Sequence, residues 1–160
     1  MRDVIKILED EAGKLCKALL PIKQEYYLGS GKAAAICTLS SFDLLDMLSR
    51  SSIMDKVLIA GRLLSENKGI DAIIGFTINH PELNQILLCG KEVKGHRAGQ
   101  ALSALARNGV DTSNRIIGAD GPNPIITRCA QDVDIFRRQV QVTDSIGTVD
   151  MDRIAQLLVS

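Results

Sequence analysis

Apolar runs and amphipathic runs alternate along the 160-residue chain, a pattern typical of α/β proteins. Residues 33–39, 86–89 and 115–119 are short and apolar, as is usual for strands buried on both faces. Residues 70–78, IDAIIGFTI, are predicted to form the strongest strand. Residues 139–146 alternate valines with polar residues, which predicts a half-exposed strand.

Helices are predicted wherever apolar residues recur every three or four positions. The sequence from Ser52 to Asp55 fits an S-x-x-D capping box at the start of one helix, and Gly69 is predicted to end that helix. Gly109 is predicted to end another. Polar residues 23–32 are predicted to be a connection. The predicted helices are residues 3–19, 42–49, 53–64, 95–108, 132–138 and 150–159.

These elements predict a Rossmann-like three-layer sandwich of the α/β class, in which a mostly parallel sheet carries helices on both faces. Residues 23–160 are expected to form one domain, and residues 1–22 an N-terminal amphipathic helix that packs on it or extends it. In such folds, ligands bind beyond the carboxyl ends of the strands. The loops predicted there are residues 79–83, 90–96 and 119–123.

Composition narrows the class of function. Aromatic residues make up 3% of the chain and the formal net charge is zero, so the basic surfaces and stacking platforms of nucleic-acid-binding proteins are not expected. The four cysteines form no C-x-x-C pair, which favours free thiols in a reducing cytoplasm. No run reaches the ~18 apolar residues of a membrane helix, so no direct membrane span is expected.

His80 is one of two histidines in the chain. It stands where the predicted strand 70–78 runs into Asn79 and Pro81, and a residue before proline is biased toward an extended backbone. We therefore expect the imidazole to sit at the carboxyl end of a strand, where it can bind a transition metal. The alternative is an ordinary turn histidine.

His96 lies in a loop that also carries Lys91, Lys94 and Arg97, just at the start of a predicted helix. Positive side chains at a helix N-terminus favour anions. Two interpretations stay open. The loop is either simply solvated, or it grips phosphate or carboxamide groups of a large ligand.

The short nucleotide-binding motifs are incomplete. Residues 29–32, GSGK, lack the G-x-x-x-x-G-K-[ST] pattern of a phosphate loop, and a predicted strand follows them where a helix is required. Thr38 to Ser41 occupy the place of a dinucleotide fingerprint after the first strand. The spacing of the histidines and cysteines does not match a structural zinc site.

Four longer segments, taken in order, resemble the corrinoid-binding A subunit of archaeal tetrahydromethanopterin S-methyltransferase. The similarity runs from about residue 27 to residue 147, and FRRQVQVTDSIG near its end also fits. The segments are AGRLLSENKGID (60–71), IIGFTINHPE (73–82), ILLCGKEVKGHRAGQAL (86–102) and RIIGADGPNP (115–124).

The resemblance implies a cobamide cofactor, 5-hydroxybenzimidazolylcobamide in the family, and a methyl-carrier subunit that is not catalytically complete alone. It implies methyl transfer from methyl-tetrahydromethanopterin to coenzyme M in methanogenesis, with other methyltransferase subunits as partners. It implies His80 as the lower axial ligand of cobalt. The further cofactor contacts expected from position and chemistry are Asn79, Pro81, Arg62, Asn67, Lys68, Gly69, Gly90, Lys91, Lys94, Gly95, His96, Gly99, Gln100, Gly118, Gly121, Pro122 and Asn123.

The chain departs from the family in two ways. Subunits of the membrane complex usually end in an anchoring helix, and this chain shows none, so we expect a soluble form or a soluble paralogue that serves another methyl acceptor. Residues 3–19 lie outside the similarity. The alternatives are a nucleotide- or flavin-binding α/β module with residues 91–96 on phosphate, and a scaffold protein that has lost the cofactor.

Overall fold

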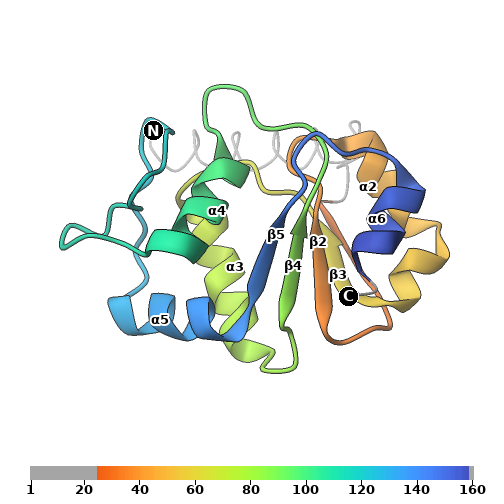
Figure 1. Cartoon of the computed structure of the whole chain (residues 1–160), viewed down its shortest axis with the longest axis horizontal. Helices are drawn as coiled ribbons and strands as arrows, with labels where there is room; N and C mark the ends of the chain where they lie inside the picture. Colours follow the sequence, from red (N-terminus) through yellow and green to blue (C-terminus); the bar gives the residue numbers. More distant parts are fainter. Residues whose placement is uncertain (1–24, 159–160) are drawn as a thin grey trace, which may run out of the picture.

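The computed structural model describes residues 25–158, which form a three-layer α/β sandwich (Figure 1). The sheet has five strands in the order β1-β3-β2-β4-β5, and only β1 runs antiparallel to its neighbour. The predicted Rossmann-like fold class is confirmed. The strands are β1 (Tyr26–Leu28), β2 (Ala34–Cys37), β3 (Val57–Gly61), β4 (Gln85–Leu88) and β5 (Gln141–Asp144).

Helices cover both faces of the sheet, because alternate side chains of each strand point to opposite faces. Cys37 and Leu88 join the core packed against α3, α4 and α5, whereas Ile36 and Leu87 join the core packed against α2, η1 and α6. The helices are α2 (Phe42–Ser49), the 3-10 helix η1 (Ser52–Asp55), α3 (Lys68–Asn79), α4 (Ala98–Asn108), α5 (Ala130–Gln139) and α6 (Met151–Leu157).

Most predicted elements are confirmed within a few residues. Strands β2, β4 and β5 lie inside the runs 33–39, 86–89 and 139–146, give or take one residue, and α2, α4, α5 and α6 lie where the periodicity predicts helices. Gly109 ends α4 as predicted, with a φ of 74° in the left-handed region that glycine favours.

Two neighbouring predictions are wrong, because helix and strand are exchanged. Residues 57–61, predicted inside a helix, form β3, and the preceding capping-box residues form only the short η1. Residues 70–78, predicted as the strongest strand, lie inside α3, and Gly69 belongs to the first turn of α3 instead of ending a helix.

The exchange has a physical cause in the two apolar sides of α3. Ile70 and Ile74 are buried in the core, while Ile73 and Phe76 line a groove beside β1. A helix with two apolar sides is apolar at nearly every position, so its sequence lacks the periodicity that separates helix from strand.

Two further predictions are wrong. Residues 115–119 form no strand, because they take part only in isolated bridges and Ile117 is 45% exposed. The predicted polar connection 23–32 contains β1 instead. The helix predicted over residues 3–19 lies outside the described residues. From residue 25 to residue 158, no helix has the length and apolar character needed to cross a bilayer.

Candidate functional site

Three connections meet beyond the carboxyl ends of the parallel strands, at the top of the molecule in Figure 1. Residues 62–67 follow β3, residues 89–97 follow β4, and residues 118–123 pack against both. The side chain of Asn67 donates a hydrogen bond to the carbonyl of Asn123 at 3.2 Å, which joins the first connection to the third. This edge is where ligands bind in doubly wound folds.

A carboxylate–histidine pair lies at the centre of these connections. His96 Nδ1 and Glu66 Oε2 are 2.8 Å apart. The Glu66 side chain is 1% exposed, whereas the His96 side chain is 53% exposed. Because a carboxylate only accepts hydrogen bonds, Nδ1 carries the proton and Nε2 keeps a lone pair when the ring is neutral.

The second carboxylate oxygen of Glu66 is also used, since Oε1 accepts a hydrogen bond from the backbone N–H of Asn123 at 3.0 Å. Burial alone raises the pKa of Glu66. Hydrogen bonds from the backbone N–H groups of Glu66 and Asn123, together with the interaction with His96, outweigh burial and hold the pKa of Glu66 below its ordinary value. Glu66 is therefore an ionised anchor for the imidazole at neutral pH.

Residues 118–123 press closely on this pair. A Cβ atom at Gly121 would lie 2.4 Å from the carbonyl oxygen of His96 and 3.0 Å from Cγ of Glu66, so only glycine fits there. Gln100 holds the same loop, because its side chain donates to the carbonyl of Gly118 and accepts from the N–H of Asp120. Asp120 in turn pairs with Arg97 at 2.8 Å.

The loop that carries His96 is itself fixed by Glu92. The Glu92 carboxylate accepts hydrogen bonds from the backbone N–H groups of Val93, Gly99 and Gln100 at 2.8–3.0 Å. It thereby caps α4, whose own N-cap residue Arg97 makes no side-chain cap and has a φ of 49°. The loop thus has a defined shape although most of it faces solvent.

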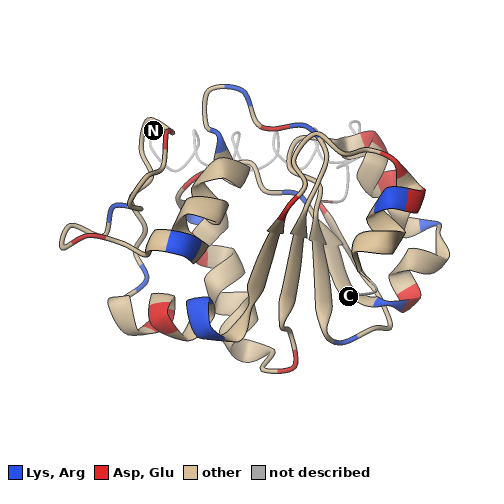
Figure 2. Cartoon of the chain, viewed as in Figure 1, with Lys and Arg blue, Asp and Glu red and all other residues tan. Residues whose placement is uncertain are grey.

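Basic side chains lie in the same loop as His96, whose own side chain is 53% exposed. Lys91, Lys94 and Arg97 lie in this loop and all three are exposed, and Figure 2 shows the loop above the carboxyl ends of the strands. Beside His96, Gly95 has a φ of 82° and open space where a Cβ atom would point. The site therefore combines a fixed imidazole, an open approach and side chains that favour anionic or amide groups.

The structure divides the predicted site residues between two edges of the sheet. Asn79, His80 and Pro81 lie at the amino ends of the strands, because they follow α3 and lead into β4. The prediction that His80 follows a strand at the carboxyl edge is therefore wrong, and its cause is the reading of α3 as a strand. The residues gathered at the carboxyl edge are Arg62, Asn67, Lys68, Gly69, Gly90, Lys91, Lys94, Gly95, His96, Gly99, Gln100, Gly118, Gly121, Pro122 and Asn123.

His80 is the C-cap of α3. Its Nδ1 lies 2.8 Å from the carbonyl oxygen of Phe76, and its ring stacks on the Phe76 ring with centroids 4.0 Å apart. The side-chain amide of Gln139 donates to the carbonyls of Thr77, His80 and Leu83 at 2.9–3.0 Å. These contacts give His80 and its turn a structural role.

Sequence reasoning missed Glu66 and Glu92 as members of the site. Glu66 immediately precedes Asn67, whose side chain accepts a hydrogen bond from the backbone N–H of Lys68 at 2.6 Å and caps α3. An Asn cap before an apolar run was the available signal for a helix start. With β3 recognised as a strand, Glu66 falls in a loop at its carboxyl end.

The family model for the A subunit of tetrahydromethanopterin S-methyltransferase matches residues 16–159. An A subunit of that enzyme from Methanothermobacter thermautotrophicus, the form numbered 2, is 43% identical over 61% of this chain. The match covers 54% of that relative, so the chain spans about half its length. The A subunit from Methanocaldococcus jannaschii is 34% identical over 86% of this chain and 56% of its own.

The A subunit of a protein from Methanosarcina barkeri named putative methyltransferase Mtx is 31% identical over 91% of this chain and 71% of its own length. The family match extends over all of the described residues, including the three connections at the carboxyl edge. The chain therefore belongs to the family formed by the A subunit of tetrahydromethanopterin S-methyltransferase.

Proposed function

We propose that the protein is the corrinoid-carrying subunit of a methyltransferase and that His96 is its cobalt ligand. The observation that carries this proposal is the 2.8 Å contact between His96 Nδ1 and the buried carboxylate of Glu66 at the carboxyl edge. A bound cobamide supplies a cobalt centre that takes up a methyl group from one partner and gives it to another.

The residues present fit such a cofactor. Glu66 holds the proton on Nδ1 of His96, which orients the ring, makes Nε2 the ligating nitrogen and raises its basicity. The His96 side chain is 53% exposed, which leaves its ring accessible, and the amide side chains of Asn67 and Gln100 belong to the same edge. Lys91 and Lys94 are suited to the phosphate and carboxamide groups that a cobamide carries.

This proposal moves the ligand from His80 to His96. In both histidines Nδ1 makes the hydrogen bond, so the tautomer alone does not decide which of the two is the ligand. The edge of the sheet favours His96, because the other expected cofactor contacts, except Asn79 and Pro81, lie at the edge that carries His96. His80 also has two structural contacts with Phe76 that account for its position.

For the whole reaction, we propose transfer of methyl from methyl-tetrahydromethanopterin to coenzyme M within methanogenesis, in a complex with other methyltransferase subunits. The names of the relatives support this reaction. A paralogue that serves another methyl acceptor is the alternative, and the similarity to the A subunit of a putative methyltransferase named Mtx is compatible with it.

Cobalt loading and electron paramagnetic resonance test the proposal with the chain's only two histidines as a matched pair. Protein incubated with cobalamin and desalted is expected to retain one cobalt per chain. In the Co(II) state, nitrogen coupling is expected to disappear in His96→Ala and to persist in His80→Ala. Cobinamide, which lacks a lower base, serves as a second probe in which only a protein nitrogen can couple.

The opposite pattern, with coupling lost in His80→Ala only, would return the ligand to His80. Coupling to cobalamin that survives both substitutions, together with none to cobinamide, would assign the axial position to the cofactor's own base. Saturable binding of a flavin or nucleotide without retained cobalt would instead support the nucleotide-binding alternative.

A further inference from the structure

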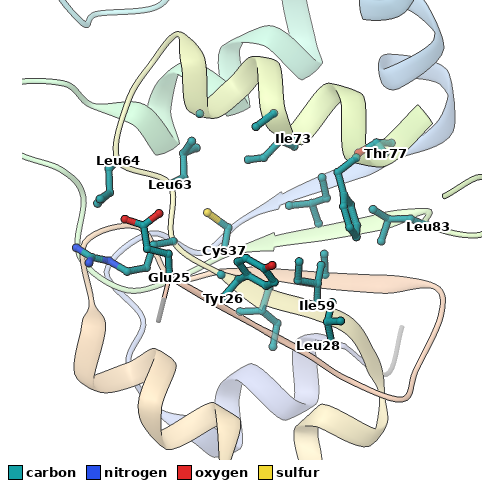
Figure 3. A pocket seen from close by; sticks show the side chains of 18 of the residues that line it. Glu25, Tyr26, Leu28, Cys37, Ile59, Leu63, Leu64, Ile73, Thr77 and Leu83 are labelled. Atoms are coloured by element: carbon teal, nitrogen blue, oxygen red, sulfur yellow. The ribbon is translucent and has the colours of Figure 1, made fainter. Parts of the chain in front are cut away.

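An apolar groove of about 600 Å³ lies between α3 and the sheet edge formed by β1 and β3 (Figure 3). In Figure 3, Ile73 and Thr77 of α3 lie on one side, and Tyr26 and Ile59 lie on the other. Cys37 of β2 contributes to the floor. The groove is on the face of the sheet that packs against α3, α4 and α5.

The groove exposes apolar side chains of a kind that are usually buried. Leu28 of β1 is 69% exposed and Tyr26 is 53% exposed, although both side chains are largely apolar. Ile73 and Phe76 give α3 a second apolar side here, and a helix that is apolar on more than one side is normally buried on each of them. These exposed apolar side chains make the groove a candidate contact site.

Two side chains that line the groove also carry a buried polar atom without a hydrogen-bond partner. Across residues 25–158, the buried side-chain atoms that have no hydrogen-bond partner are Nε of Arg62 and Oγ1 of Thr77, and both residues line the groove. An unpaired buried polar atom costs about 1–3 kcal/mol.

The chain itself contains a segment whose apolar side suits this groove. Residues 1–24 precede Glu25, and Glu25 lines the groove, so the chain enters the described domain at the groove's rim. As a helix, residues 3–19 would be ~25 Å long, enough to follow the ~18 Å of α3 from end to end. At helical spacing, one stripe of this segment is apolar and consists of Val4, Ile7, Leu8, Ala12, Leu15 and Leu19.

We propose that residues 3–19 form a further helix of this layer and dock their apolar stripe into the groove between β1 and α3. Docking covers Leu28 and Tyr26 and completes the helical layer over the sheet edge. The docked segment also contacts residues 62–65, which line the groove and lead directly to Glu66. The N-terminal segment therefore supports the connection that positions His96.

Thiol crosslinking within the full chain tests this docking, because Cys16 provides a reactive group in the segment. Cys129 is exposed and is first replaced by Cys129→Ser. Leu28→Cys adds a thiol at the groove, and Met47→Cys adds a matched thiol at a 53% exposed position of α2 on the opposite face. After treatment with a short bifunctional maleimide, peptide mass spectrometry is expected to find Cys16 linked to position 28 within one chain, and not to position 47.

Three results would overturn the proposal. They are links to position 47 as frequent as links to position 28, links to position 28 between chains only, and no link to either position. The between-chain result would assign the groove to a second copy.

Hydrogen exchange gives an independent measurement. The double substitution Leu8→Gln with Leu15→Gln removes part of the stripe, and Glu9→Gln with Lys14→Gln is the matched control on the polar side. Exchange at β1 is expected to be at least roughly tenfold faster in the stripe variant and unchanged in the control, because uncovered edge amides open more readily. Equal exchange in both variants, or protection that disappears on dilution, contradicts docking within the chain.

Discussion

The two histidines show how a partner decides what the same side chain can do. His80 bonds to a backbone carbonyl and stacks on Phe76, so its ring completes a helix end. His96 bonds to a buried carboxylate and is 53% exposed, so its ring is fixed yet accessible. The carboxylate partner, more than the imidazole itself, is what makes His96 suited to bind a metal and His80 suited to cap a helix.

Glu66 is expected to make stability depend on pH. Its pKa is lower in the folded protein than the ordinary value of 4.5, so its contribution is present above that value and is lost as pH falls through the folded pKa. At neutral pH, Glu66→Gln is expected to lower the free energy of unfolding by about 1–3 kcal/mol. The difference should shrink below pH 4.5, as measured by urea unfolding.

Glu82→Gln, at an exposed position, is the control and should show no such trend. A wild-type advantage that grows toward acid would mean that the Glu66 carboxylate is destabilised by folding, contrary to its hydrogen bonds.

His80→Ala is expected to lower the free energy of unfolding by about 1–2 kcal/mol, because it removes the contact with the Phe76 carbonyl and the ring stack. Cobalamin affinity should stay at the wild-type value when measured by titration of the folded protein. Unchanged stability with lost cobalamin binding would show that the ring serves the cofactor and not the helix.

At the scale of elements, the sequence correctly predicts the helices and strands that are apolar on one side and polar on the other. α4 is identified correctly because its buried residues, such as Leu102 and Leu105, recur at helical spacing. α3 and β3 are exchanged because both are apolar on more than one side, which removes the periodicity. The predicted position of His80 at the carboxyl edge is wrong for the same reason, and Glu66 is overlooked for that reason too.

Other features depend on contacts that no local pattern contains. β1 is three residues long and pairs only with β3, so its short sequence carries no periodic signal. The contact of Glu66 with His96 joins residues 30 positions apart, and Gly121 becomes essential only once that pair is in place.

Glu92 is expected to matter for the start of α4. Glu92→Ala removes the acceptor of three backbone N–H groups and should cost about 1–2 kcal/mol, the usual range for loss of a helix cap. Hydrogen exchange at Gly99 and Gln100 should accelerate, while Glu82→Ala leaves it unchanged. Unaltered exchange at those two amides would show that the loop holds its shape without the carboxylate.

At the scale of the whole molecule, the reactivity of the cysteine thiols measures how often the two hydrophobic cores open to solvent. Burial raises the pKa of Cys37 and Cys89 to about 12, whereas Cys129 is exposed. At about pH 8, Ellman's reagent is therefore expected to modify Cys129 rapidly, and to reach Cys37 and Cys89 only at the rate of unfolding.

Addition of denaturant should make all four cysteines of the chain react at once. Rapid modification of Cys37 in the native protein, with Cys89 still protected, would reveal that the groove beside α3 stands open to reagents.

The placement of α3 has a consequence for the domain as a whole. The helix begins shortly after Glu66 at one edge of the sheet and ends at His80 at the other, a span of ~18 Å for 12 residues. A helix is far stiffer along its axis than a loop, so the separation between these two ends is nearly constant. A shift of the first turn of α3 along that axis is therefore expected to displace the turn at His80, whose carbonyl accepts a hydrogen bond from Gln139 on the far side of the protein.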